Sequence, residues 1–371
     1  MLDFKKKLLD IVGENASIKH IQKTLKQVPY CMTFKYNETH GLLKYNRGKS
    51  DLDNSFVKEC RGVIFRLDDY KIVNHTLNGG LEETEFKKNY CIDECVVYES
   101  IDGTLLNVYY DNNKWNVSTK GCIDAEKSSW YSNKSFLELM NECSTTIDYS
   151  KLDEDCCYSI VLTHIDNRIV VEHNENKLYH VYTRNLKTDK YVEQDIGIVK
   201  PLKLEIDSYQ TILKSESLDS EGVMIYNNDM TDRCKIQTTI YKKVKELRGN
   251  QSTAWGRILS LPKQKINDYL DYYPEDKDDY ISLCRVKNKL FSSILHYYIQ
   301  TKVKRIYTEI PQYLKSPVYE LHTIYKQALA EYNKAGTTKK PYISKKQIIE
   351  LFHDLPIYKQ LYLLQSESTC S

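Results

Sequence analysis

Two different hydrophobic patterns divide this chain. From about residue 28 to 240, short runs rich in β-branched and aromatic residues are separated by turns of Asp, Asn and Gly, as is typical of β-strands. One such turn, Asp111-Asn112-Asn113-Lys114, is a hairpin signal. After about Ile240, apolar residues recur at helical spacing and prolines punctuate them. The pattern predicts an α+β domain with antiparallel sheets over residues 1–245, followed by an all-α domain over residues 246–371.

Individual elements follow from the same spacing. We expect helices over residues 1–25, near 124–146 and 207–215, and over 241–249, 262–273, 278–306, 317–335 and 344–364. We expect strands at residues 62–65, 95–98, 105–110, 115–118, 158–162, 168–171, 177–182 and 223–226. The strands do not alternate with helices, so the sequence argues against a Rossmann-type parallel sheet.

Charge is distributed unevenly along the chain. The formal net charge is +2, but residues 241–371 hold 22 Lys and Arg against 13 Asp and Glu. A basic C-terminal third is typical of a domain that faces a polyanion, although a solvated helical surface gives the same count. No apolar run approaches the roughly 20 residues that cross a bilayer, and the N-terminus lacks the apolar core of a secretory signal. We therefore expect an intracellular, cytoplasmic protein with reduced cysteines and no membrane partner.

Several short polar segments follow one another in a defined order between residues 59 and 237. Seen alone, Asp102-Gly103-Thr104 is an ordinary turn sequence. It is accompanied, however, by Glu59-Cys60-Arg61-Gly62-Val63-Ile64-Phe65, Thr119-Lys120-Gly121, Asn167-Arg168-Ile169-Val170, Asp219-Ser220-Glu221-Gly222 and Cys234-Lys235-Ile236-Gln237. In this order and spacing, residues 28–245 resemble the adenylyltransferase domain of the RNA ligase 1 family of phage T4 type.

The resemblance implies a fold, a chemistry and a set of residues. The fold would be a ligase-type nucleotidyltransferase domain with antiparallel sheets around a nucleotide cleft, and its cofactors would be ATP and Mg²⁺. Arg61 matches an arginine that contacts the nucleotide phosphates, and Glu221 matches a glutamate linked to the metal and the nucleotide. The remaining matching positions, all expected to bind nucleotide, are Asp102, Gly103, Lys120, Gly121, Gly222 and Lys235.

Three positions depart from the family pattern. Ser100 stands where the family has the lysine whose amine attacks ATP, Ser159 replaces a glutamate that contacts ribose, and Gln237 replaces the second lysine of a Lys-x-Lys motif. A hydroxyl with no evident base nearby cannot form the phosphoramidate that lysine forms. The leading hypothesis is a divergent RNA-ligase-like protein that binds RNA, and ATP with Mg²⁺ if the pocket still functions, but does not adenylylate itself.

Other readings stay open at this point. An active ATP-dependent RNA ligase is one, with Lys120 as a displaced nucleophile. Another is a ligase that seals only pre-adenylylated RNA 5′ ends, because that last step needs phosphate-stabilising cations rather than a lysine amine. A non-catalytic interaction scaffold is a third. In the helical domain, Lys302, Lys304 and Arg305 lie among tyrosines, and this mixture predicts RNA contact unless the tyrosines serve only packing.

Overall fold

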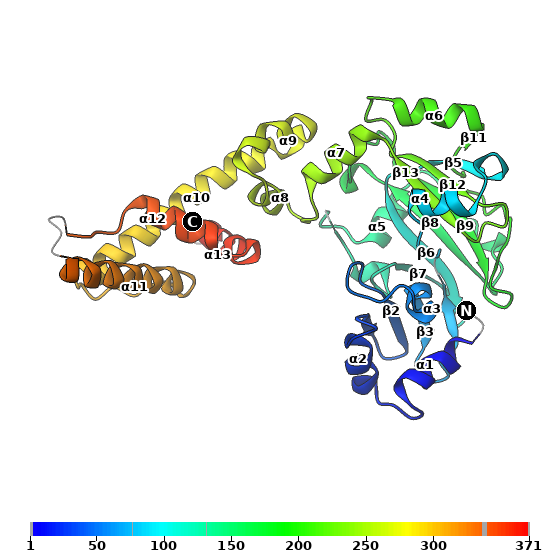
Figure 1. Cartoon of the computed structure of the whole chain (residues 1–371), viewed down its shortest axis with the longest axis horizontal. Helices are drawn as coiled ribbons and strands as arrows, with labels where there is room; N and C mark the ends of the chain where they lie inside the picture. Colours follow the sequence, from blue (N-terminus) through cyan, green and yellow to red (C-terminus); the bar gives the residue numbers. More distant parts are fainter. Residues whose placement is uncertain (1–2, 76, 131, 336–339, 370–371) are drawn as a thin grey trace. The chain divides into compact units, whose positions relative to one another are not determined.

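The structure is a computed structural model that describes residues 3–75, 77–130, 132–335 and 340–369. It divides into two compact units, Met1–Lys245 and Glu246–Ser371 (Figure 1). The first unit is built on three antiparallel sheets, and the second contains only helices within its described residues. The predicted α+β architecture, with antiparallel sheets and an all-helical C-terminal region, is therefore confirmed. Among the described helices, none combines the length and apolar character that a bilayer crossing requires.

The first sheet of unit 1 carries two N-terminal helices on one face. Its strands follow the chain in order: β1 (Thr33–Tyr36), β2 (His40–Lys44), β3 (Arg61–Arg66) and β4 (Ile72–Asn74). The helices are α1 (Phe4–Val12) and α2 (Ile18–Lys26), whose buried Phe4, Leu8 and Leu25 pack against the sheet. Gly13, with a φ of 85°, ends α1, and the Ser17 side chain caps α2. The single helix predicted over residues 1–25 is therefore two helices.

The second sheet holds five strands and lies against the first. Its order is β10 (Lys190–Tyr191), β9 (Lys177–Asn185), β8 (Cys156–Thr163), β6 (Thr104–Asp111) and β7 (Lys114–Thr119). Apolar residues of the first sheet pack on Tyr109 and Cys157 of the second. The predicted hairpin between β6 and β7 is confirmed: Asn112 and Asn113 have φ values of 54° and 58°, which suits the mirror-image turn that matches strand twist.

The third sheet carries much of the candidate site. Its order is β11 (Lys203–Leu204), β5 (Val96–Ser100), β12 (Gly222–Tyr226) and β13 (Arg233–Gln237). Helices α4 (Glu83–Asn89) and α6 (Ile206–Lys214) contribute buried Phe86 and Tyr209 to its core. The remaining regular elements of the unit are α3 (Ser55–Glu59), α5 (Phe136–Asn141), α7 (Thr239–Arg248) and four short 3₁₀ helices at Ile92–Glu94, Ala125–Lys127, Tyr149–Lys151 and Ile165–Asn167.

One predicted strand is wrong for a physical reason. Residues 168–171 were expected to be a strand because they include three successive β-branched residues, but they lie in the connection between β8 and β9. The backbone N–H groups of Val170 and Val171 each donate to Asp102 Oδ2 at 2.8 Å. A side-chain carboxylate therefore takes the donors that a neighbouring strand would otherwise use.

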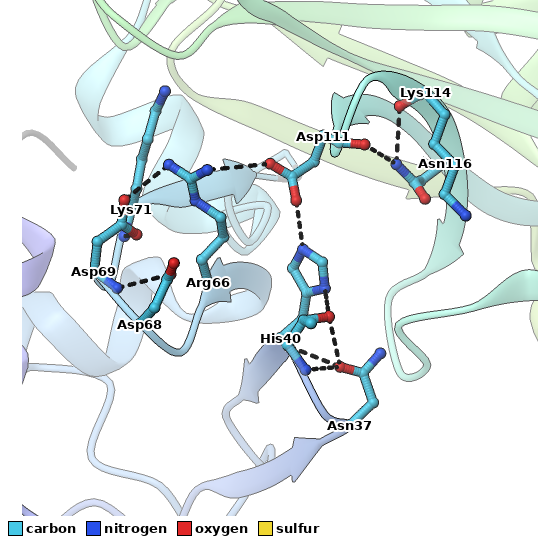
Figure 2. A network of polar contacts seen from close by, with 10 residues as sticks. Asn37, His40, Arg66, Asp68, Asp69, Lys71, Asp111, Lys114 and Asn116 are labelled. Atoms are coloured by element: carbon cyan, nitrogen blue, oxygen red, sulfur yellow. Dashed lines mark hydrogen bonds and ion pairs between the residues drawn. The ribbon is translucent and has the colours of Figure 1, made fainter.

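A buried hydrogen bond between a histidine and a carboxylate links the first sheet to the second (Figure 2). His40 on β2 and Asp111 at the end of β6 are each 8% exposed in their side chains, and His40 Nε2 lies 2.8 Å from Asp111 Oδ2. Arg66 on β3 approaches the other oxygen of Asp111 at 3.8 Å. The Asn37 side chain accepts hydrogen bonds from the backbone N–H groups of Thr39 and His40, and its bond to His40 can be followed in Figure 2. These bonds shape the turn before β2.

Unit 2 packs its helices around one long central helix. The helices are α8 (Ala254–Ser260), α9 (Ile266–Tyr272), α10 (Lys277–Tyr298), α11 (Gln312–Ala335), α12 (Lys345–Asp354) and α13 (Ile357–Thr369), and α10 is the central one. Two 3₁₀ turns, Lys263–Lys265 and Pro274–Asp276, precede α9 and α10, and a π-helical turn, Ile299–Val303, follows α10. Leu290, Phe291 and Ile294 of α10 are buried, and Glu367 of α13 accepts hydrogen bonds from Ser293 and Tyr313 at 2.9 Å each.

Helix boundaries in unit 2 differ from the prediction at four places. Helix α10 ends at Tyr298, and the π-helical turn after it ends at Val303, short of the predicted end at 306. The segment predicted as one helix over 344–364 is divided at Pro356 into α12 and α13, since proline cannot donate the hydrogen bond that would continue the helix. Helix α11 starts before Pro317 rather than at it. Helix α8 was not predicted, and the Thr253 side chain caps its N-terminus.

Candidate functional site

The cleft of unit 1 lies between the second and third sheets. Four of the predicted site residues line it, namely Arg61, Ser100, Gly103 and Lys235. Four tyrosines form an aromatic wall, one from each of four strands: Tyr98 of β5, Tyr182 of β9, Tyr191 of β10 and Tyr226 of β12. The rings are inclined to one another, Tyr98 to Tyr226 by 80° and Tyr182 to Tyr191 by 44°, and aromatic faces beside cationic groups can hold a planar base together with an anionic tail.

Strand register brings three of the predicted positions together. Gly222 pairs with Ser100 of β5 on one side and with Gln237 of β13 on the other. Glu221, which directly precedes β12, is thereby placed between these two neighbours, and its side chain is 3% exposed. Gly222 has a φ of 134°, and a Cβ there would lie 2.2 Å from the Ile236 carbonyl oxygen, so only glycine fits without a backbone shift.

Besides Tyr241, whose hydroxyl interacts with it as well as with Asp102, three side chains hold the Glu221 carboxylate. Ser100 Oγ donates to Oε2 at 2.7 Å, Lys235 Nζ lies 2.7 Å from the same oxygen, and Gln237 Nε2 donates to Oε1 at 2.7 Å. The expectation that Ser100 has no base nearby is therefore wrong, because a carboxylate accepts its hydroxyl hydrogen. Two of the three residues that depart from the family pattern share this one carboxylate.

The environment of Glu221 makes it a weak base. Burial alone would raise its pKa, but the charge of Lys235 and the hydrogen bonds from Lys235, Ser100 and Gln237 outweigh burial, so the pKa of Glu221 is lowered. A carboxylate with a lowered pKa has little tendency to accept a proton from a serine hydroxyl. The arrangement therefore orients Ser100 without activating it as a nucleophile.

A group of cations lies next to this cluster. Arg61 Nη1 donates to the Leu77 carbonyl at 3.0 Å, and Arg233 Nη2 donates to the neighbouring Asn78 carbonyl at 3.0 Å. Burial, followed by the charge of Arg233, lowers the pKa of Arg61 to about 10. Burial, followed by the charges of Arg61, Lys44, Arg47 and Arg233, lowers the pKa of Lys120 to about 8. Positive charges that lower one another's pKa values make a favourable place for an anion.

Close backbone packing joins this group to the first sheet. Gly62, with a φ of 99°, lies so near Lys120 that a Cβ would be 2.7 Å from the Lys120 carbonyl oxygen. Lys35 Nζ donates to the carbonyl of Gly121 at 2.7 Å. The conformational freedom of Gly62 therefore lets β3 approach the end of β7 and brings Arg61 toward Lys120.

Asp102 accepts hydrogen bonds from three groups of its own unit. Its carboxylate is 4% exposed, and besides the bonds to Val170 and Val171 it accepts a hydrogen bond from the Tyr241 hydroxyl at 2.6 Å. Burial and the charge of Asp102 raise the pKa of Tyr241. Asp102 therefore ties the loop after β5 to the β8–β9 connection and to α7. Tyr241 was missed by the sequence analysis, because nothing local distinguishes it from other tyrosines of a predicted helix.

Ser159 lies among buried polar groups. Its side chain donates to Asn107 Oδ1 at 3.0 Å, and Ser159 and Asn107 are 3% and 1% exposed. Gly103 lines the cleft, and a Cβ there would lie 2.4 Å from the Leu162 carbonyl. The structure thus brings Ser100, Glu221, Gly222, Lys235 and Gln237 into one cluster and Arg61 with Lys120 into another, while Ser159 belongs to neither.

The RNA-binding candidates of unit 2 lie at the end of α10. Lys302 Nζ lies 4.1 Å from the centre of the Tyr319 ring, in a cation–π contact. Lys304 and Arg305 are exposed in the segment that follows, and Tyr307 is 98% exposed. We refer to Lys302, Lys304, Arg305, Tyr307 and Tyr319 as the α10 end surface.

Two viral proteins are similar to this chain in sequence. No protein-family model matches the chain. The chain is 27% identical over 273 residues to a protein of Autographa californica nuclear polyhedrosis virus named "Putative bifunctional polynucleotide kinase/RNA ligase", which covers 64% of this chain and 38% of that protein. It is 28% identical over 132 residues to the immediate-early protein ICP-46 homolog of Invertebrate iridescent virus 3, covering 33% of this chain and 28% of that protein. The chain therefore spans well under half the length of these curated relatives.

Among solved structures, an archaeal ATP-dependent RNA ligase (form 2) gives a TM-score of 0.45 at 11% identity. The match covers 77% of this chain and 78% of that chain.

Proposed function

We propose that this chain is an RNA-ligase-like protein that binds a nucleotide in the cleft of unit 1, contacts RNA through unit 2, and does not form a covalent adenylate. The observation that carries the proposal is the Ser100 hydroxyl hydrogen-bonded to Glu221 at 2.7 Å, at the position of the family's nucleophilic lysine. The aromatic wall, the cations around Arg61 and the viral relative named as an RNA ligase support nucleotide and RNA as the ligands.

The chemistry of the first ligation step explains why we expect the protein not to adenylylate itself. A neutral lysine amine attacks the α-phosphorus of ATP, a P–N bond forms, and pyrophosphate leaves. Ser100 offers no amine, and the one carboxylate that contacts its hydroxyl has a lowered pKa. With ATP in the cleft, the aromatic wall would contact the base, while Arg61, Lys120, Arg233 and Lys235 would hold the phosphates.

The proposal is tested by incubating the full chain with ATP labelled at the α-phosphate. We expect no covalent label on the protein in the presence of magnesium. An acid-labile label would indicate a phosphoramidate on a lysine such as Lys120, and an acid-stable label would indicate a phosphoester on Ser100. Either label contradicts the proposal, and binding of unlabelled nucleotide measured by calorimetry shows whether the cleft is functional.

A second candidate function is sealing of RNA ends that already carry AMP. In that step a 3′-hydroxyl attacks the 5′-phosphate and AMP leaves, so no enzyme amine bonds to phosphorus. The retained cations Arg61, Lys120 and Lys235 favour this candidate, because they can stabilise charge on the departing AMP. A 5′-adenylylated RNA offered with an acceptor strand distinguishes the two: joined product supports sealing, and unchanged RNA leaves binding as the function.

Nucleotide affinity is expected to fall in mild alkali because of Lys120. Its pKa in the free protein is about 8, so above that pH the amine must take up a proton before it can pair with phosphate. Affinity for AMP should therefore decline as pH rises through 8, by up to about tenfold per pH unit. Lys120→Arg keeps its charge throughout this range and should remove most of the decline. Calorimetric titrations at about pH 7 and pH 9 check this, and an equal decline in both proteins would exclude Lys120 as a phosphate ligand.

RNA binding is expected to depend on salt through the α10 end surface. Neutralising Lys304 and Arg305 with Lys304→Gln/Arg305→Gln should reduce the slope of log affinity against log salt by about 1.4 for single-stranded RNA. Tyr307→Ala should weaken binding by about 1–3 kcal/mol without changing that slope, because its ring can only stack. The control, Lys263→Gln/Lys265→Gln, removes the same charge from exposed residues before α9. If the control lowers the slope as much, the RNA contact is not specific to this surface.

A further inference from the structure

The magnesium role that the family pattern assigns to Glu221 does not fit the side chains around it. Three of its partners occupy both oxygens, with Gln237 on Oε1 and with Ser100 and Lys235 on Oε2. Magnesium requires oxygen ligands at about 2.0–2.1 Å in near-octahedral geometry. An ion on Oε2 would share that oxygen with the Lys235 ammonium, and an ion on Oε1 would displace the Gln237 amide.

Glu221 is also unable to turn away from these partners without disturbing the sheet. Its carbonyl oxygen accepts a hydrogen bond from the Thr238 N–H at 3.1 Å. The following residue, Gly222, donates its N–H to Ser220 Oγ at 3.1 Å and has a backbone conformation that a side chain would not tolerate. Backbone contacts on both sides of Glu221 therefore fix where its side chain starts.

The other acidic groups near the cleft do not supply a replacement site. Glu99 is the one carboxylate among the described lining residues, and a single carboxylate offers little for an ion that also faces Arg61, Arg233 and Lys235. Asp102 is committed to Val170, Val171 and Tyr241. The charges that face the cleft are mainly positive, and they can neutralise phosphate directly.

We infer that nucleotide binding in this cleft is independent of a divalent cation, with the protein's own cations taking the place of the metal at the phosphates. Ser100, Lys235 and Gln237 keep Glu221 satisfied, so the carboxylate neither needs nor recruits an ion. This inference rests on the proposed nucleotide binding, and it goes beyond it by separating the ligand from the metal that normally accompanies it.

Calorimetric titration with AMP and with ADP tests the inference on the full chain. Affinity measured in magnesium and in EDTA should agree within about threefold, or about 0.65 kcal/mol. A larger loss of affinity in EDTA would overturn the inference while leaving nucleotide binding intact. If neither nucleotide binds under either condition, the proposed function fails, and the inference fails with it.

A pair of variants tests whether the partners of Glu221 are what makes nucleotide binding independent of magnesium. Ser100→Ala/Gln237→Ala removes two of these partners and should make affinity for ADP more than threefold higher in magnesium than in EDTA. Ser159→Ala, which removes a buried serine that contacts Asn107 instead, should stay independent of magnesium. Thermal unfolding establishes that both variants are folded. If the folded double variant is as insensitive to magnesium as the wild type, Ser100 and Gln237 are not what excludes the metal.

Discussion

Ser100→Lys is expected to give the protein a covalent AMP label that the wild type lacks. The position is the last residue of β5, it lines the cleft, and it directly contacts Glu221. A lysine amine placed there would be buried near Lys235, which favours the neutral, nucleophilic form, while the adjacent Glu221 carboxylate favours the charged form but is shared with Lys235 and Gln237. The cations that we propose hold the phosphates are already present, so we expect the label to rise from background to a clear band.

Ser100→Arg is the matched control for this experiment. Arginine has a similar length and charge but stays protonated and does not form the phosphoramidate, so it should remain unlabelled. The label on Ser100→Lys should be lost in acid and on addition of pyrophosphate, as the reversal of adenylylation requires. A Ser100→Lys protein that binds ATP yet stays unlabelled would mean that the missing lysine is not what silences the first step.

Asp102→Ala is expected to cost about 3–5 kcal/mol of unfolding free energy. The substitution leaves two buried N–H groups and one buried hydroxyl without their acceptor, because Val170, Val171 and Tyr241 all donate to this carboxylate. Tyr241→Phe removes one of those donors and keeps the other two bonds, so its cost should be about 1–2 kcal/mol. Urea unfolding of the full chain provides the measurement.

The size of the two effects separates a structural role from a ligand contact. If Asp102→Ala loses less than about 1 kcal/mol but abolishes nucleotide binding, Asp102 acts on the ligand rather than on the fold. The prediction also requires that Asp102→Ala and Tyr241→Phe are not additive when combined, since both remove the same hydrogen bond.

Local sequence patterns predicted seven of the thirteen described strands, because the causes of those strands are local, and missed β1, β2, β4, β10, β11 and β13. The run of β-branched and aromatic residues at 105–110 and the Asn112-Asn113 turn each contain the reason for their conformation. Residues 168–171 have the same composition as a strand, yet a carboxylate from a distant loop binds their N–H groups. Composition indicates which conformation a segment favours. Here the acceptor that prevents strand pairing is Asp102, some 70 residues earlier in the chain.

The candidate site was predictable in its members but not in their contacts. The motif order identified Ser100, Glu221, Lys235 and Gln237 individually. That two departures from the family pattern meet on one carboxylate depends on the register of β5, β12 and β13, and the β5–β12 pairing joins residues more than 100 positions apart. The expectation that Ser100 has no base nearby failed for this reason, and Tyr241 was missed because its partner is equally remote.

The buried His40–Asp111 pair limits how this protein can be cut into pieces. A fragment that begins after β4 would retain Asp111 without His40 or Arg66, and would expose the face of Tyr109 and Cys157 that the first sheet covers. The loss of these partners and the exposure of this apolar face would both destabilise the fragment. The N-terminal segment is consequently no detachable appendage, and a fragment of unit 1 meant to fold by itself should keep the whole sheet from β1 to β4.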